Sequence, residues 1–143
     1  MKKYVMPLLC AVLCMTLLCS CATLLQPIDR ANALSKLDKI EQECLEKGYD
    51  VARLSESEMN SVIESIVAEE GIVLDGPAVG VLTYSYEEQD AFVIATVIAA
   101  SSAKDAKALA GAILNMTDEA ANESLRVEIE QSEMIVTMLQ IYG

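Results

Sequence analysis

The most apolar stretch of the chain lies near its start, where residues 4–18 contain no charged side chain and follow Lys2 and Lys3. A short basic segment followed by an apolar segment is typical of a secretory signal peptide. The lysines favour the cytoplasmic side of a membrane, while the apolar segment partitions into it. We therefore expect the rest of the chain to leave the cytosol.

Beyond this stretch, three segments carry apolar residues at the spacing of one helix face. The first covers residues 33–47. The second begins at Ser55, which forms a capping box with Glu58, and it ends at Gly71, a residue that tolerates the left-handed conformation of a helix end. The third begins at Ser102, whose hydroxyl can cap the first turn. The pattern predicts three amphipathic helices, each with one buried stripe.

Four further segments have the pattern of strands, namely residues 78–86, 91–100, 125–130 and 134–142. Residues 92–98 are apolar on both faces of such a strand, so this strand should lie centrally and be covered on both sides. The element order ααββαββ predicts an α+β fold in which helices pack on a four-stranded antiparallel sheet.

The apolar stretch at the start ends with Leu18-Cys19-Ser20-Cys21. This segment resembles the lipobox of bacterial lipoprotein signal peptides, in which a branched apolar residue, a tolerant position and a small residue precede a cysteine. The resemblance implies cleavage before Cys21 and a thioether-linked diacylglycerol on its sulfur. It also implies a place in the bacterial cell envelope, anchored to the outer face of the cell membrane or to the outer membrane.

Other readings of this segment remain open. Cleavage before Cys19 would place the bulky Leu18 at the small position, and Cys10 and Cys14 lie well inside the apolar run. The segment 4–25 contains 22 uncharged residues, which is long enough for an uncleaved membrane helix. Cleaved or uncleaved, the domain would lie outside the cell.

These observations divide the chain into three parts. Residues 1–20 are the expected signal peptide, 21–32 the lipidated N-terminus and tether, and 33–143 a single α+β domain. Removal of the first 20 of 143 residues leaves 123, which suits one hydrophobic core.

The chain is strongly acidic. It contains 22 acidic and ten basic residues, and the loss of Lys2 and Lys3 with the signal peptide would leave a net charge of −14. Such a charge disfavours nucleic acid as a partner and permits a cationic partner in the envelope. It also keeps a tethered domain soluble.

Little in the composition points to catalysis. The chain has no histidine, which removes the commonest general base and the commonest transition-metal ligand. Cys44 would be the one free thiol left after lipidation, and its place on the apolar stripe of the first helix predicts that it is buried. We expect no cofactor and no catalytic residue.

Two local patterns still offer chemistry. Ser101 and Lys104 have the Ser-x-x-Lys spacing in which a lysine can activate a serine, although the companion motifs of that enzyme class are missing. Glu87, Glu88 and Asp90 cluster at a predicted hairpin turn and are weak candidates for binding a metal cation. A solvated turn is the alternative for the carboxylates.

Part of the domain resembles small lipoproteins of Firmicutes that are built around a domain of unknown function. The likeness lies in the hairpin around residues 90–93, the capped helix from Ser102 and the closing hairpin through residues 134–136. The resemblance implies no known activity.

We expect a membrane-anchored lipoprotein whose domain is a non-enzymatic binding or accessory module. The alternatives are a cell-wall hydrolase and a lipoprotein that binds a small ligand or a cation. The membrane itself is the expected partner through Cys21, and a homodimer through the sheet is a further hypothesis.

The lipid anchor gives the first testable prediction. Mass spectrometry of the protein from its native host should find a lipid-modified N-terminal peptide that begins at Cys21. Cys21→Ser removes the acylated sulfur, so this variant should lose the lipid and should not yield the mature form that begins at residue 21. A Cys21→Ser protein that still migrates as the mature form and stays in the detergent phase would contradict this prediction.

Overall fold

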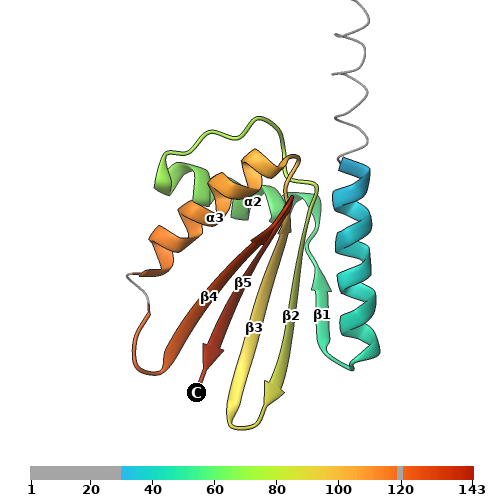
Figure 1. The fold of residues 1–143 in the computed structure, drawn as a ribbon, viewed down its shortest axis with the longest axis vertical. Coiled ribbons are helices and arrows are strands. Elements are labelled where there is room, and N and C mark those ends of the chain that lie inside the picture. The colour runs from blue at the N-terminus through green and yellow to red at the C-terminus, as the bar shows by residue number, and fades with distance from the viewer. Residues whose placement is uncertain (1–29, 119–120) are drawn as a thin grey trace, which may run out of the picture.

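A five-stranded antiparallel sheet with helices on both faces forms the body of the molecule (Figure 1). The computed structural model describes residues 30–118 and 121–143. After a helix through residues 30–46, the elements in chain order are β1 (Asp50–Arg53), α2 (Glu56–Glu70), β2 (Gly80–Glu88), β3 (Ala91–Ala99), α3 (Ala103–Asp118), β4 (Leu125–Ser132) and β5 (Ile135–Tyr142).

The strands lie in the order β1-β2-β3-β5-β4, so β3 is the middle strand. The expected α+β class and the central position of residues 92–98 are thus confirmed. The β2–β3 and β4–β5 pairs are hairpins, and β5 returns to pair with β3 with Ala95 opposite Leu139.

The expected number of four strands is wrong, because β1 adds a fifth at the edge of the sheet. β1 has only four residues, and it pairs with β2 so that Val51 lies opposite Tyr84. A four-residue edge strand that includes Asp50 and Arg53 has too short an apolar alternation to stand out from a loop. Residues 30–32, which we assigned to the tether, are helical, whereas the remaining tether residues lie outside the described chain.

One face of the sheet is covered by α2 and α3, which lie together at the end of the sheet away from the β2–β3 turn (Figure 1). Their stripes bury Met59, Ile63 and Leu109 against Ile98 and Val136 of the sheet. The capping box predicted at the start of α2 is present, and Gly71 ends this helix with a φ of 63°. The cap at the start of α3 is also confirmed, since the Asp105 backbone N–H donates to Ser102 Oγ at 3.1 Å.

The other face is covered by helix 30–46, which runs alongside β1 (Figure 1). Ala33 and Leu37 are fully buried in a second core cluster that includes Leu82 and Val97. A Cβ on Gly80 would lie 2.7 Å from Leu37 Cδ2, so glycine permits this close approach. The helices therefore supply the cover that a central strand with two apolar faces requires.

Polar contacts fix the position of helix 30–46 against the sheet. Arg53 of β1 donates to Asp38 at 2.7 Å and to Glu41 at 2.8 Å. Lys36 pairs with Glu133 in the β4–β5 turn. These exposed or half-exposed pairs add little free energy individually, but they select one orientation of the helix.

One carboxylate is buried within the described chain. Asp105, with 2% of its surface exposed, accepts hydrogen bonds from the backbone N–H groups of Asp75 and Gly76 at 2.9 and 3.1 Å. The Ser101 hydroxyl donates to the same carboxylate at 2.9 Å. Asp105 thus joins the first turn of α3 to the loop before β2.

Removing this carboxylate should destabilise the domain. Asp105→Ala would leave two backbone donors and one hydroxyl without their acceptor, which should lower the free energy of unfolding by about 3 kcal/mol. Urea denaturation of the variant measures this loss, and Asp118→Ala, at the exposed end of the same helix, is the matched control. Equal stability of the two variants would contradict the role of Asp105.

Candidate functional site

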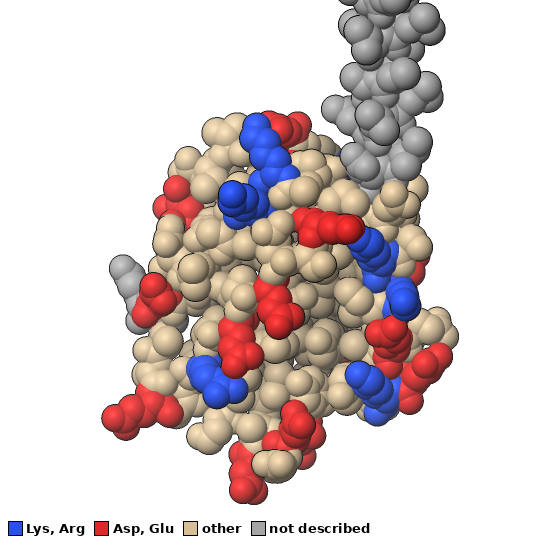
Figure 2. Space-filling view, in the orientation of Figure 1, with Lys and Arg blue, Asp and Glu red and all other residues tan. Residues whose placement is uncertain are grey.

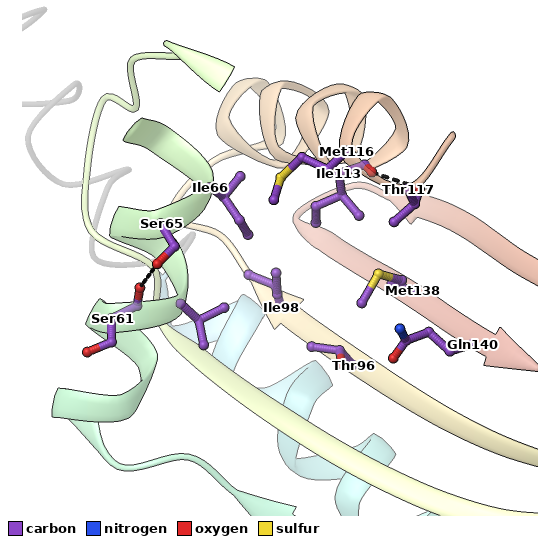
Figure 3. Close-up of a pocket in the computed structure, with 11 residues that line it drawn as sticks. Ser61, Ser65, Ile66, Thr96, Ile98, Ile113, Met116, Thr117, Met138 and Gln140 are labelled. Atoms are coloured by element: carbon purple, nitrogen blue, oxygen red, sulfur yellow. Dashed lines mark hydrogen bonds between the residues drawn. The ribbon is translucent and has the colours of Figure 1, made fainter. Parts of the chain in front are cut away.

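An open apolar groove lies between α2, α3 and the sheet (Figure 3). Its volume is about 460 Å³, within the range of small-molecule sites. Ile98 and Met138 lie on its sheet side, and Ile66 and Ile113 project from the two helices. The lining residues are Ser61, Val62, Ser65, Ile66, Thr96, Ile98, Ile113, Met116, Thr117, Met138 and Gln140.

The groove follows from the way each element presents its side chains. Val62, Ser65 and Ile66 lie on one side of α2, while Ile113 and Met116 lie on one side of α3, because residues three and four apart share a helix face. On β3, Thr96 and Ile98 point to the same face because strand residues alternate. Two helix stripes and a strand face thus meet around one space.

The polar groups of the groove are mostly turned to their own helices. Ser65 donates to the Ser61 carbonyl at 2.9 Å, and Thr117 donates to the Ile113 carbonyl at 2.8 Å. Their hydroxyl oxygens keep lone pairs that can accept a hydrogen bond. Thr96 and Gln140, both on strands, are the other polar lining residues besides Ser61.

No ionisable side chain of residues 30–118 and 121–143 lines the groove, although 22% of the chain is charged. An unpaired charge is costly to bury in an apolar site. The groove is therefore suited to an uncharged ligand, and its lining residues offer no acid or base for proton transfer.

Apolar surface continues from the groove along the uncovered part of the same sheet face. Ile94 and Phe92 follow Thr96 on β3, and Tyr142 of β5 lies opposite Phe92. Phe92 is 41% exposed and Tyr142 39% exposed. A shallow hollow of about 180 Å³ lies on this part of the sheet, and it combines the apolar Phe92 and Ile94 with polar residues of β1 and β2, namely Asp50, Thr83 and Ser85.

The opposite face of the sheet carries a stack of three tyrosines. Tyr49 lies 4.5 Å from Tyr86 and 5.9 Å from Tyr84 between ring centroids, and the rings are almost parallel. Burial raises the pKa of Tyr84 to about 12, with a further contribution from Cys44. Lys47 lies 5.7 Å above the Tyr49 ring, where a cation is attracted to the aromatic face.

Cys44 is buried, as its place in the helix pattern predicted. Burial raises the pKa of its thiol, which keeps the thiol protonated and unreactive near neutral pH.

The weak metal candidates do not come together. Glu87 and Glu88 are consecutive strand residues, so their side chains point to opposite faces of the sheet. Asp90 lies exposed in the β2–β3 turn. Within residues 30–118 and 121–143, no group of three or more Cys, Asp or Glu side chains is arranged to hold a metal ion.

The serine and lysine of the Ser-x-x-Lys pattern contact different acidic residues. Ser101 donates to Asp105, and the Lys104 ammonium lies 3.2 Å from the Asp75 carboxylate. The serine therefore stabilises a loop in this structure. Cys21, the expected lipidation site, lies outside the described residues.

Sequence reasoning missed the groove, because its residues carry the same pattern as a core. Val62, Ile66 and Ile113 belong to the apolar stripes that the helix pattern predicts to be buried, and Ile66 and Ile113 are indeed buried. Two polar residues in the sequence could have indicated the groove. Thr96 interrupts an apolar central strand, and Gln140 interrupts the apolar last strand. Thr96 and Gln140 are diagonal neighbours on β3 and β5, since Gln140 lies opposite Ile94 and Thr96 opposite Met138.

Comparisons with protein-family models, with curated proteins and with solved structures find no match to this chain. Among the described residues, no helix combines the length and the apolar character that a membrane span requires.

Proposed function

We propose that this chain is a lipid-anchored, non-enzymatic binding protein of the bacterial cell envelope, and that the groove between α2 and α3 is its binding site. The lipobox resemblance at Cys21 supports the anchor. The observation that carries the binding function is the groove itself, which is open, apolar and of ligand size.

The character of the groove favours binding over hydrolysis. A cell-wall hydrolase of the glycosidase type needs two carboxyl groups that converge on a substrate. Within the described part of the chain no carboxylate lines the groove, and the buried Asp105 is engaged with backbone N–H groups of the 75–76 loop. We therefore propose a binding protein rather than a cell-wall hydrolase.

Binding of a cationic envelope partner is a second candidate function, and it would use the acidic surface of β4 rather than the groove. Glu128 and Glu130 are exposed on β4, and they add to the negative environment of Tyr86 and Tyr84. Figure 2 shows acidic side chains spread over the visible face without one dominant patch, which favours a role in solubility. A homodimer would use the edge strand β4, which pairs with β5 alone in the described sheet.

Photo-crosslinking in cells tests the binding function. Photo-leucine, a leucine-sized residue that carries a diazirine and leaves most of the groove open, should form an adduct with the bound ligand when it replaces Ser65 on the groove wall. The same residue at position 57 is the matched control, because Ser57 is an exposed serine of α2 that does not line the groove. We expect an adduct from position 65 alone, seen as a mass shift of the purified protein. Absence of an adduct, or the same adduct from both positions, would contradict groove binding.

A further inference from the structure

We infer that the groove binds one hydrocarbon chain of a membrane phospholipid, with the uncharged ester end of that chain near Thr96 and Gln140. This inference rests on the proposed function and specifies its ligand class. Four features of the described chain support it: the lining chemistry, the state of the polar groups, the apolar surface that continues from the groove, and the place where the chain enters the domain.

The lining chemistry matches an acyl chain. Val62, Ile66, Ile98, Ile113 and Met138 offer aliphatic and thioether contacts. Burial of a methylene contributes about 0.8 kcal/mol, so a chain of several carbons gains substantial free energy without any directed bond. Methionine side chains adapt their shape to an irregular or flexible ligand.

The polar groups of the groove favour a ligand whose polar end forms hydrogen bonds but carries no charge. Ser65 and Thr117 already donate within their helices, so they would act towards a ligand as acceptors. Gln140 offers both an amide donor and a carbonyl acceptor, and Thr96 offers a hydroxyl. Carbonyl oxygens of an ester can accept from these groups. The phosphate of the same lipid would remain in solvent, since the lining residues include no cation to pair with it.

The apolar surface beyond the groove offers room for a long ligand. Ile94, Phe92 and Tyr142 extend the apolar contacts along the strands towards the β2–β3 turn. At about 3.3 Å per strand residue, the six steps from Phe92 to Ile98 span about 20 Å. Because the ester lies near Thr96, the bound hydrocarbon chain occupies the Ile98 side of this path, and the Phe92 side is left for the second chain of the same lipid.

The chain enters the described domain beside α2. Arg30 lines a second hollow together with Glu56, Met59 and Asn60 of this helix, and Ser61 follows at the groove. Eight residues separate Cys21 from Arg30, and even a fully extended chain between these two residues spans only about 30 Å. A lipid anchor at Cys21 would therefore hold the α2 wall of the groove within reach of membrane lipid.

Peptide ligands fit this groove less well. An α-helix with side chains is about 10–12 Å across, which demands a wide trough, and an extended peptide brings N–H and C=O groups at every residue. Among the described residues, the groove offers five polar side chains, and three of these have their hydroxyl protons engaged. A hydrocarbon chain makes no such demand.

Photoactivatable phospholipids in vesicles test the inference with the full processed protein, anchored through Cys21. One phosphatidylcholine probe carries a diazirine on an acyl chain, and a second carries it on the headgroup. After illumination, mass spectrometry of peptides should find the acyl probe on segments that contain Met116 and Met138. The headgroup probe should label these segments at least about tenfold less, because its charged end would remain in solvent away from the apolar lining.

Groove-filling variants provide the decisive comparison. Ser65→Trp and Ser61→Trp each place a large ring at the groove from an exposed position, so both should fold and both should reduce acyl labelling of the groove about tenfold. Ser57→Trp, on the same helix but outside the groove, should leave the labelling unchanged. Unlabelled groove peptides in the wild type, or undiminished labelling in both groove variants, would overturn the inference.

The two tests fail in different ways. An adduct from position 65 in cells, combined with no acyl labelling in vesicles, would show a groove that binds another ligand, which overturns the inference and leaves the proposed function in place. Failure of both tests would remove the binding function as well.

Discussion

The fold depends on one constraint, which is that the middle strand of the sheet is apolar on both faces. Val97 and Ile98 are both almost completely buried, yet they point to opposite sides of β3. Each side therefore needs its own cover, because an uncovered apolar strand would lose most of its hydrophobic stabilisation. Helix 30–46 covers the Val97 side, and α2 with α3 covers the Ile98 side.

The two covers differ in how they are held and in how much they leave open. Helix 30–46 packs closely at Gly80 and is oriented by the ion pairs of Arg53. On the other face, α2 and α3 cover only one end of the strands, and the space between their apolar stripes and the sheet forms the groove. The same stripes that build the core thus continue into a surface that can bind a ligand, and the Asp105 carboxylate fixes the loop that leads from α2 to β2.

Much of this architecture could be predicted from the sequence, because local signals and periodicity were strong. The capping box at Ser55, the left-handed Gly71 and the central strand 92–98 each rest on a few neighbouring residues. β1 could not be predicted, since four residues give no readable period and its pairing partner lies about 30 positions away. The groove could not be predicted for a related reason. Periodicity shows which residues are apolar, whereas only packing in three dimensions shows where the apolar stripes of two helices leave a space above the sheet. The role of Asp105 could not be predicted either, because its backbone partners at Asp75 and Gly76 lie about 30 positions away in the sequence.

The claim that this groove is open is tested most directly by methionine oxidation of the folded protein. Met116 and Met138 line the groove, whereas Met59 and Met134 are buried in the two core clusters with 8% of their surface exposed. Mild peroxide followed by peptide mass spectrometry compares the four thioethers within one sample, since sulfoxide formation follows exposure. The account predicts that Met116 and Met138 are oxidised first, while Met59 and Met134 are protected until the domain unfolds. Equal protection of all four would mean that the helices close onto the sheet, and it would contradict the account.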